Sequence, residues 1–354
     1  ELSNFRLDWR KRVVFHTELH PCSMNRFDCG FRRLERKPPV AVKPQNGVIR
    51  FENGEIVIGI NCATGLIDRY QVKGVDYLRE GAFRPVVMKD TYNSWDAGFS
   101  RFSDIEGAFS LMSPEEGSEF SGLPGSSLPS VRVAEDGEVR MVVEALFRYN
   151  NSFIRQLYKL PKRGTEVEVE TWAYWLEKDK MLKLTVPASF TKANYYGQAI
   201  WGSEQLRDDG TEAVSQKWNA IVSKVDNKAV TLINNGTYGS NFHNGELRAT
   251  LLRSAAYSAS DFEGRRAMSP DCFTPRMDQG ERIYRFWLNA GDARERMKRI
   301  DREAQVHNEE PCALSFCPSG EGNLPVSLVV LNNDSIVLLA LKKAELSGNY
   351  IILN

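Results

Sequence analysis

The stretch Thr165–Trp172, with the sequence TEVEVETW, alternates acidic and β-branched residues. Successive side chains of a strand point to opposite faces, so this pattern predicts a strand with one face in water. Strands are also predicted at Val139–Phe147, Met181–Val186 and Ala229–Ile233. The dominant period of the chain is therefore two.

Two hairpins are predicted from turn residues between apolar runs. Val48–Ile60 is expected to turn at Asn53-Gly54, and Val326–Leu341 is expected to turn around Asn332-Asn333-Asp334. Only Ala293–His307 has a helical period, with apolar residues on one face and Arg and Glu on the other. Many strands separated by turn signals favour an all-β protein of stacked sandwiches over an α/β barrel.

Proline and glycine mark the expected domain boundaries. Arg36–Pro44 carries three prolines and predicts a boundary, whereas Ser113–Ser130 is rich in Gly, Ser and Pro and is expected to be an exposed loop. We expect three segments: 1–38 as the end of a small sandwich with a linker, 39–308 as the large domain, and 309–354 as the start of a C-terminal β segment. Both ends look like cuts within a longer protein.

The charge balance disfavours some partners. Lys plus Arg and Asp plus Glu both number 46, so the net charge is zero. A nucleic-acid or anionic-membrane partner normally requires a basic excess, and neither is expected here. No visible transport signal precedes Glu1, which favours a cytoplasmic location. The six cysteines lack C-x-x-C spacing and are expected to be free thiols.

Seven segments, in order along the chain, resemble the C-terminal half of glycoside hydrolase family 38, the α-mannosidases. They are Trp9–Phe31, Phe51–Ile67 (FENGEIVIGINCATGLI), Asp90–Phe99 (DTYNSWDAGF), Thr171–Leu184 (TWAYWLEKDKMLKL), Asn234–Ser254 (NNGTYGSNFHNGELRATLLRS), Asp278–Phe286 (DQGERIYRF) and Ile336–Glu345 (IVLLALKKAE). The resemblance implies a galactose-mutarotase-like supersandwich with smaller β-sandwich segments attached, including closing strands within Trp9–Phe31.

The resemblance also implies that the chemistry lies elsewhere. Family members are retaining α-mannosidases with an Asp nucleophile and a second carboxylate, which such a mechanism holds about 5 Å apart. A zinc ion bound by His and Asp also holds the sugar. In the family these groups belong to an upstream barrel and helical domain, and none of their motifs occurs in this chain. No catalytic residue and no cofactor are therefore expected here, with zinc implied for the parent enzyme.

The four histidines are expected to be structural. His16 and His20 have i, i+4 spacing, which suits zinc only on a helix, and Pro21 favours a strand instead. His243 and His307 stand alone. We predict no metal site in this chain.

Arg253 is the strongest candidate for a contact with sugar. It ends a predicted strand, and its guanidinium carries five donors that can bind hydroxyl groups. The resemblance implies that it points toward the active site of the barrel; an interdomain ion pair is the alternative. Arg248 lies an odd number of residues away and is expected on the opposite face.

Three aromatic residues are candidates for stacking on sugar rings: Trp95, Trp201 and Tyr238. Trp175 lies within a predicted strand and is expected in the core. Asp90, Asp96, Asp278 and Glu281 are expected to be structural or to support other site residues, with Asp278-Gln279-Gly280 as a tight turn.

The sequence thus predicts the C-terminal part of a retaining α-mannosidase, inactive alone, which braces the barrel and lines one wall of the α-mannoside site. A homo-oligomer is possible. The alternatives are a stand-alone carbohydrate-binding or structural sandwich, and a mutarotase-like enzyme with its own site. The last requires converging His and Glu residues, which four scattered histidines disfavour.

Overall fold

The computed structural model describes most of the chain, in these ranges: 13–30, 35, 40, 42–95, 101–200, 202–257, 261–262, 265–266, 273–313, 327–333, 336–346, 348 and 351–353. The chain divides into two compact units. One is Pro39–Cys312, and the other combines Glu1–Pro38 with Ala313–Asn354. Neither helix in the described ranges has the length and apolar character needed to span a bilayer.

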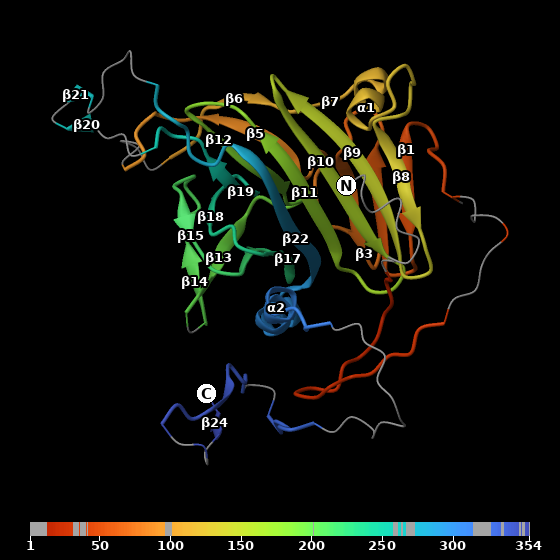
Figure 1. Cartoon of the computed structure of the whole chain (residues 1–354), viewed down its shortest axis with the longest axis vertical. Helices are drawn as coiled ribbons and strands as arrows, with labels where there is room; N and C mark the ends of the chain where they lie inside the picture. The colour runs from red at the N-terminus through yellow and green to blue at the C-terminus, as the bar shows by residue number, and fades with distance from the viewer. Residues whose placement is uncertain are drawn as a thin grey trace. The chain divides into compact units, whose positions relative to one another are not determined.

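The larger unit is an antiparallel β-sandwich (Figure 1). Its first layer is a ten-stranded sheet. In spatial order its strands are β14 (Gly202–Leu206), β13 (Ala193–Ala199), β16 (Trp218–Ser223), β17 (Lys228–Asn234), β22 (Gly280–Asp292), β11 (Val167–Trp175), β10 (Ser152–Pro161), β9 (Arg140–Tyr149) and β7 (Ser110–Leu111), with β8 (Val131–Asp136) also paired to β9.

The second layer is a six-stranded sheet, and a four-stranded sheet adds to the same core. The six strands are β15 (Ala213–Val214), β18 (Gly239–His243), β19 (Glu246–Arg253), β12 (Lys180–Pro187), β5 (Arg84–Lys89) and β6 (Ile105–Ala108). The four strands are β1 (Val48–Glu52), β2 (Ile56–Asn61), β3 (Ile67–Val72) and β4 (Val75–Asp76). Two short pairs complete the list: β20 (Asp261–Phe262) with β21 (Arg265–Arg266), and β23 (Leu341–Lys343) with β24 (Ile351–Leu353).

The all-β prediction is confirmed, and so are the four strands predicted from the sequence, which correspond to β11, β9, β12 and β17. Along β11 the odd-numbered residues are buried and the even-numbered ones partly exposed, as the TEVEVETW pattern requires. Trp175 is fully buried, as expected. The hairpin at Asn53-Gly54 is confirmed as β1 and β2.

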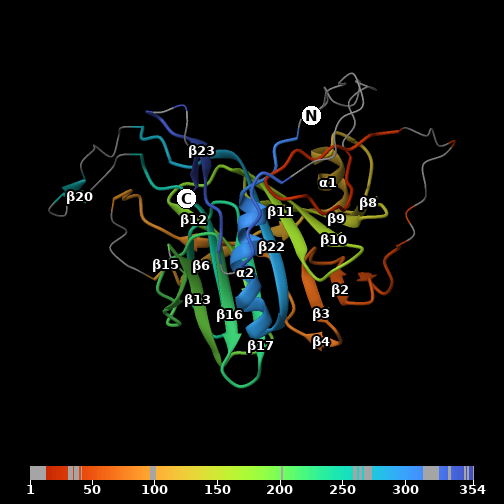
Figure 2. The ribbon, with the colours of Figure 1, turned by 90° about the horizontal axis from the view of Figure 1, so that it is seen from below.

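The predicted helix is α2 (Ala293–Asn308), whose buried residues include Ala293, Ile300 and Ala304. It packs on the outer face of β16, β17 and β22 (Figure 2), where Ile300 and Ala304 join a small apolar cluster with Trp218. An amphipathic helix needs such a surface because its stability comes mostly from burying one face.

Three expectations about secondary structure are wrong. The Ser113–Ser130 loop contains a helix, α1 (Pro114–Phe120), whose Ser113 and Glu116 form a capping box. Residues 13–30 contain no strand, so His16 and His20 lie in irregular chain. In the predicted second hairpin, residues 327–333 and 336–340 form no strand. The antiparallel pairing in this part of the chain is instead between β23 and β24. Polar turn residues suit a loop as well as a hairpin, so the asparagines alone did not fix this pairing.

Gly65 gives a test of the shared core. It has φ of +74°, and an added Cβ would lie 2.8 Å from Leu111 Cδ1 and 2.9 Å from Phe147 Cζ. Gly65→Ala should therefore lower the free energy of unfolding by about 2–5 kcal/mol, since backbone strain and overpacking add. Gly54→Ala is the matched control because Gly54 also has positive φ, +88°, but nothing within 4 Å. Urea unfolding should show a loss of about 1–2 kcal/mol for the control. Equal losses in both variants would contradict the packing argument.

Candidate functional site

The predicted site residues that the structure describes, Arg253, Trp95 and Tyr238, lie at one end of the six-stranded sheet, which we call the loop end. β5 and β19 finish there with Lys89 and Arg253, and β12 and β18 begin there with Lys180 and Gly239. The loops that leave these strands, including 91–95 and 235–238, therefore come from distant parts of the sequence to one edge of the molecule.

Arg253 is held by a buried carboxylate. Its Nε donates to Asp90 Oδ2 at 2.5 Å and its Nη2 to Asp90 Oδ1 at 3.0 Å, and the Asp90 side chain is fully buried. Nη2 also donates to the Asn93 carbonyl at 2.7 Å, and the guanidinium carbon lies 6.0 Å from the centre of the Phe102 ring. The Arg253 side chain remains 22% exposed. The guanidinium thus fixes the loop after β5 and still reaches the surface.

This loop brings Trp95 close to Arg253. The Trp95 backbone N–H donates to Asn93 Oδ1 at 2.9 Å, while the Asn93 carbonyl accepts from Arg253. The Trp95 side chain is 75% exposed. The loop thus carries an exposed aromatic residue two positions from the carbonyl that Arg253 binds, and an apolar ring together with hydrogen-bond donors is a combination that suits a sugar.

Tyr238 lies at the same end but in a second group. Its carbonyl accepts from the Ser215 N–H at 3.0 Å, beside a hollow formed by the β13–β14 hairpin and the segment after β15. Trp201 and Asp96 lie outside the described residues. The structure therefore brings Arg253 together with Trp95 and places Tyr238 separately.

The expectation that Arg248 faces away from Arg253 is wrong. In the pairing of β12 with β19, Thr185 is opposite Arg248, Lys183 is opposite Thr250, and Met181 is opposite Arg253. Directly paired residues share a face, and Thr185, Lys183 and Met181 all lie on one face of β12. The strand β19 has one additional residue, Leu251, at a β-bulge. The bulge restores Arg253 to the face of Arg248.

The same face carries a polar cluster that the sequence analysis missed: Lys183, Glu212, Asn241 and Thr250. Lys183 is fully buried, and its Nζ donates to Glu212 Oε2 at 2.5 Å and to Asn241 Oδ1 at 3.1 Å. Thr250 Oγ1 donates to Glu212 Oε1. Burial lowers the pKa of Lys183, while the neighbouring Glu212 carboxylate opposes this change. The alternation of side chains along β12 predicts that Lys183 faces away from Leu182 and Leu184. It does not reveal that residues from another part of the chain cover Lys183.

The residue that covers Lys183 is Phe102, which belongs to the loop before β6. The Phe102 ring lies 5.9 Å from Lys183 Nζ and packs with Val86 and Met88. Arg101 anchors the loop by binding Asp209 at 2.6 Å. Hydrogen bonds from Thr211, together with Arg101, hold the pKa of Asp209 well below its usual range. Phe102 thus covers Lys183, while the Glu212 side chain remains 20% exposed, and we assign the cluster a structural role.

Four other residues considered in the sequence analysis have their surroundings described: Asp278, Glu281, His243 and His307. Glu281 is exposed, and Asp278 accepts a hydrogen bond from the Arg253 backbone N–H at 3.4 Å. His243 contacts the Asp208 carbonyl, and His307 bonds Glu166 at 2.6 Å while stacking on Trp287. The described ranges contain no group of three His, Cys, Asp or Glu side chains that could hold a metal. They therefore do not fit a zinc site.

The comparisons with known proteins agree with the fold. The model of the glycosyl hydrolases family 38 C-terminal domain matches residues 51–271, more than half of the chain. The chain therefore belongs to glycoside hydrolase family 38, as the sequence resemblance predicts. No curated protein sequence matches this chain significantly.

Two solved structures from Enterococcus faecalis share the fold. One is an α-mannosidase of strain V583, with a TM-score of 0.58 and 13% sequence identity. The alignment covers 77% of this chain and 32% of the mannosidase chain. The other is a protein in the glycosyl hydrolase family 38, with a TM-score of 0.58 and 14% identity, over 77% and 33% of the two chains. This chain spans about a third of the length of each.

The Arg253–Asp90 pair can be tested by a double-mutant cycle. Arg253→Met should lower the free energy of unfolding by about 3–5 kcal/mol, because it leaves the buried Asp90 carboxylate without its partner. Asp90→Leu combined with Arg253→Met should recover most of this loss, since both charges are then removed. Chemical unfolding of the wild-type protein, the two single variants and the double variant gives the coupling energy. Additive effects would show that the pair is not coupled in solution.

Proposed function

We propose that this chain is the C-terminal part of a retaining α-mannosidase, and that its loop end lines one wall of the mannoside site in the parent enzyme. The single observation that carries the proposal is the position of Arg253, whose guanidinium is held by Asp90 and binds the carbonyl of Asn93 in the loop that carries the exposed Trp95. Family membership and the α-mannosidase with the same fold support it.

The exposed apolar residues of the loop end support a contact surface there. Tyr257 and Phe273 are 65% and 83% exposed, and both belong to loops linked to this end by backbone bonds: Ala256 N–H to Tyr92 O, and Tyr257 N–H to Pro275 O. Exposed apolar residues in such a group mark surfaces that bind a partner or a ligand. We propose the upstream barrel and helical domain as this partner.

The chemistry in this proposal is divided between the parts of the parent enzyme. The upstream part supplies the nucleophile, the acid/base carboxylate and the zinc ion. This chain contributes donors that orient the sugar hydroxyls and an apolar face for the ring, which together hold the substrate for attack. Arg253 is well suited to this role because Asp90 preorganises its guanidinium at no further entropic cost on binding.

A stand-alone carbohydrate-binding module is the second candidate function. The exposed Trp95 and Tyr238 favour it, since such modules bind sugars with surface aromatics. It differs from the first proposal in needing no other domain: the isolated chain would bind sugar, but mutation of its loop end would leave catalysis by a linked domain unchanged.

Kinetics of the full-length parent enzyme separate the two functions. Arg253→Lys keeps the charge but loses the bidentate geometry, and Trp95→Ala changes a side chain that is 75% exposed. Each should reduce kcat/KM for an aryl α-mannoside by about 10- to 100-fold, the equivalent of one charge-assisted hydrogen bond or a similar contact. Arg140→Ala is the matched control, because Arg140 forms a bidentate pair with Glu135 at the opposite end of the sandwich. If all three variants kept normal kinetics, the loop end would have no part in the site.

The isolated chain should not hydrolyse aryl α-mannosides and should purify without stoichiometric zinc. Loss of even one member of a catalytic unit typically costs several orders of magnitude, and here we propose that the whole unit lies upstream. Turnover assays and elemental analysis check both points. Turnover that disappears when one Asp or Glu of this chain is changed, or about one tightly bound zinc per chain, would overturn this division of roles.

A further inference from the structure

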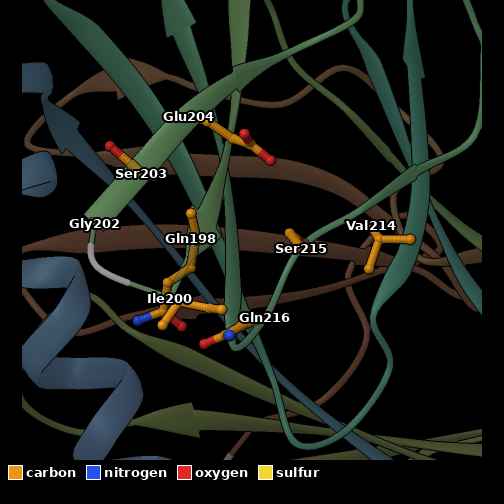
Figure 3. A pocket seen from close by; sticks show the side chains of 9 residues that line it. Gln198, Ile200, Gly202, Ser203, Glu204, Val214, Ser215 and Gln216 are labelled. Atoms are coloured by element: carbon orange, nitrogen blue, oxygen red, sulfur yellow. The ribbon is translucent and has the colours of Figure 1, made fainter.

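A hollow of about 540 Å³ lies between the tip of the β13–β14 hairpin and the segment that follows β15 (Figure 3). Ile200 and Glu204 line it from the hairpin, and Val214 and Ser215 line it from the other side. Its volume is in the range of small-molecule sites. No role in the proposed function depends on it.

The hollow is bounded by hydrogen bonds between Gln198 of β13 and the segment that follows β15. Gln216 N–H donates to the Gln198 carbonyl at 2.9 Å, and Lys217 N–H donates to Gln198 Oε1 at 3.0 Å. Gly197 permits this approach, because a Cβ there would lie 2.6 Å from Ser215 Cβ. The segment 215–217 is therefore fixed against β13, and the hollow does not require a ligand to form.

The lining is apolar with neutral hydrogen-bonding groups. Ile200 and Val214 are 71% and 73% exposed, so their side chains are available to the C–H face of a ligand. Ser203 and Gln216 add a hydroxyl and an amide. Among the described residues that line the hollow, Glu204 has the only charged side chain, and its negative charge disfavours an anion.

Ser215 closes one side of the hollow. The residue is only 3% exposed and its Oγ is buried, so the hydrogen-bonding groups that a ligand can reach are the Ser203 hydroxyl and the Gln216 amide. The Ser215 N–H donates to the Tyr238 carbonyl at 3.0 Å, which ties the loop of the exposed Tyr238 to this segment.

We propose that this hollow is a second carbohydrate subsite, which binds one neutral pyranose unit of a glycan apart from Arg253. A pyranose presents hydroxyl groups around an apolar ring face, and the hollow offers matching hydrogen-bonding groups beside apolar side chains. We expect an uncharged sugar, because the described lining residues include no basic side chain that would attract an acidic sugar. The choice of mannosides as probes rests on the proposed function; the existence of the subsite does not.

The test is an NMR titration of this 354-residue chain with methyl α-mannoside and with α-mannobiose. Saturable shifts should occur at residues 198–204 and 214–216. Val214→Trp fills the hollow and should abolish binding, whereas Val225→Trp, a matched change at a side chain that is 76% exposed, should not. Ser203→Ala should weaken binding about three- to tenfold, the loss of one neutral hydrogen bond. Glu204→Gln should strengthen binding of a glucuronide relative to the neutral sugar.

The outcomes distinguish this subsite from the proposed function. Absence of saturable binding, or binding unaffected by Val214→Trp, would overturn the subsite. Binding lost in Arg253→Lys and kept in Val214→Trp would place the sugar at Arg253, which would overturn the subsite and support the proposed function. Binding that requires Val214 while the parent kinetics are insensitive to Arg253 would support the subsite alone.

Discussion

One apolar core joins the three largest sheets, and the positions of all the loops discussed above depend on it. Residues of the four-stranded sheet such as Ile58 are buried together with Leu182 of β12 and Val169 of β11. The core is built from strands that are far apart in sequence, so its formation fixes long-range pairings rather than local turns. Because β12 is buried on both faces, it orders the six-stranded sheet from its centre, and the loop end takes its geometry from this strand.

The bulge in β19 shows that sequence periodicity can identify a strand and still give the wrong face for one of its residues. The strands predicted from the sequence correspond to β11, β9, β12 and β17, and of these four β11 alternates buried and partly exposed residues along its whole length. Simple alternation gives the wrong face for Arg248 relative to Arg253, because Leu251 adds one residue that its partner strand lacks. A bulge depends on the pairing partner, so no count along one strand reveals it.

The site was predictable in part. Arg253 and Trp95 were found from their motifs. The structure links Arg253, at the end of β19, to the loop that carries Trp95, and the interaction that makes this link, Asp90 with Arg253, spans 163 positions of sequence. The polar cluster around Lys183 was missed, because Phe102 covers it from a loop outside the strand pattern. The helix α1 had a local signal in its Ser113–Glu116 capping box, so that omission was avoidable.

The edges of the two large sheets limit how this protein can associate. The six-stranded sheet ends in β15, only two residues long, and in β6, whose Glu106 pairs with Lys180. The ten-stranded sheet ends on one side in β14, with an exposed Glu204. Short or charged edges are poor templates for strand addition. A protein partner should therefore recognise side chains on the loops, and growth of the sheets into a continuous intermolecular β-structure is disfavoured.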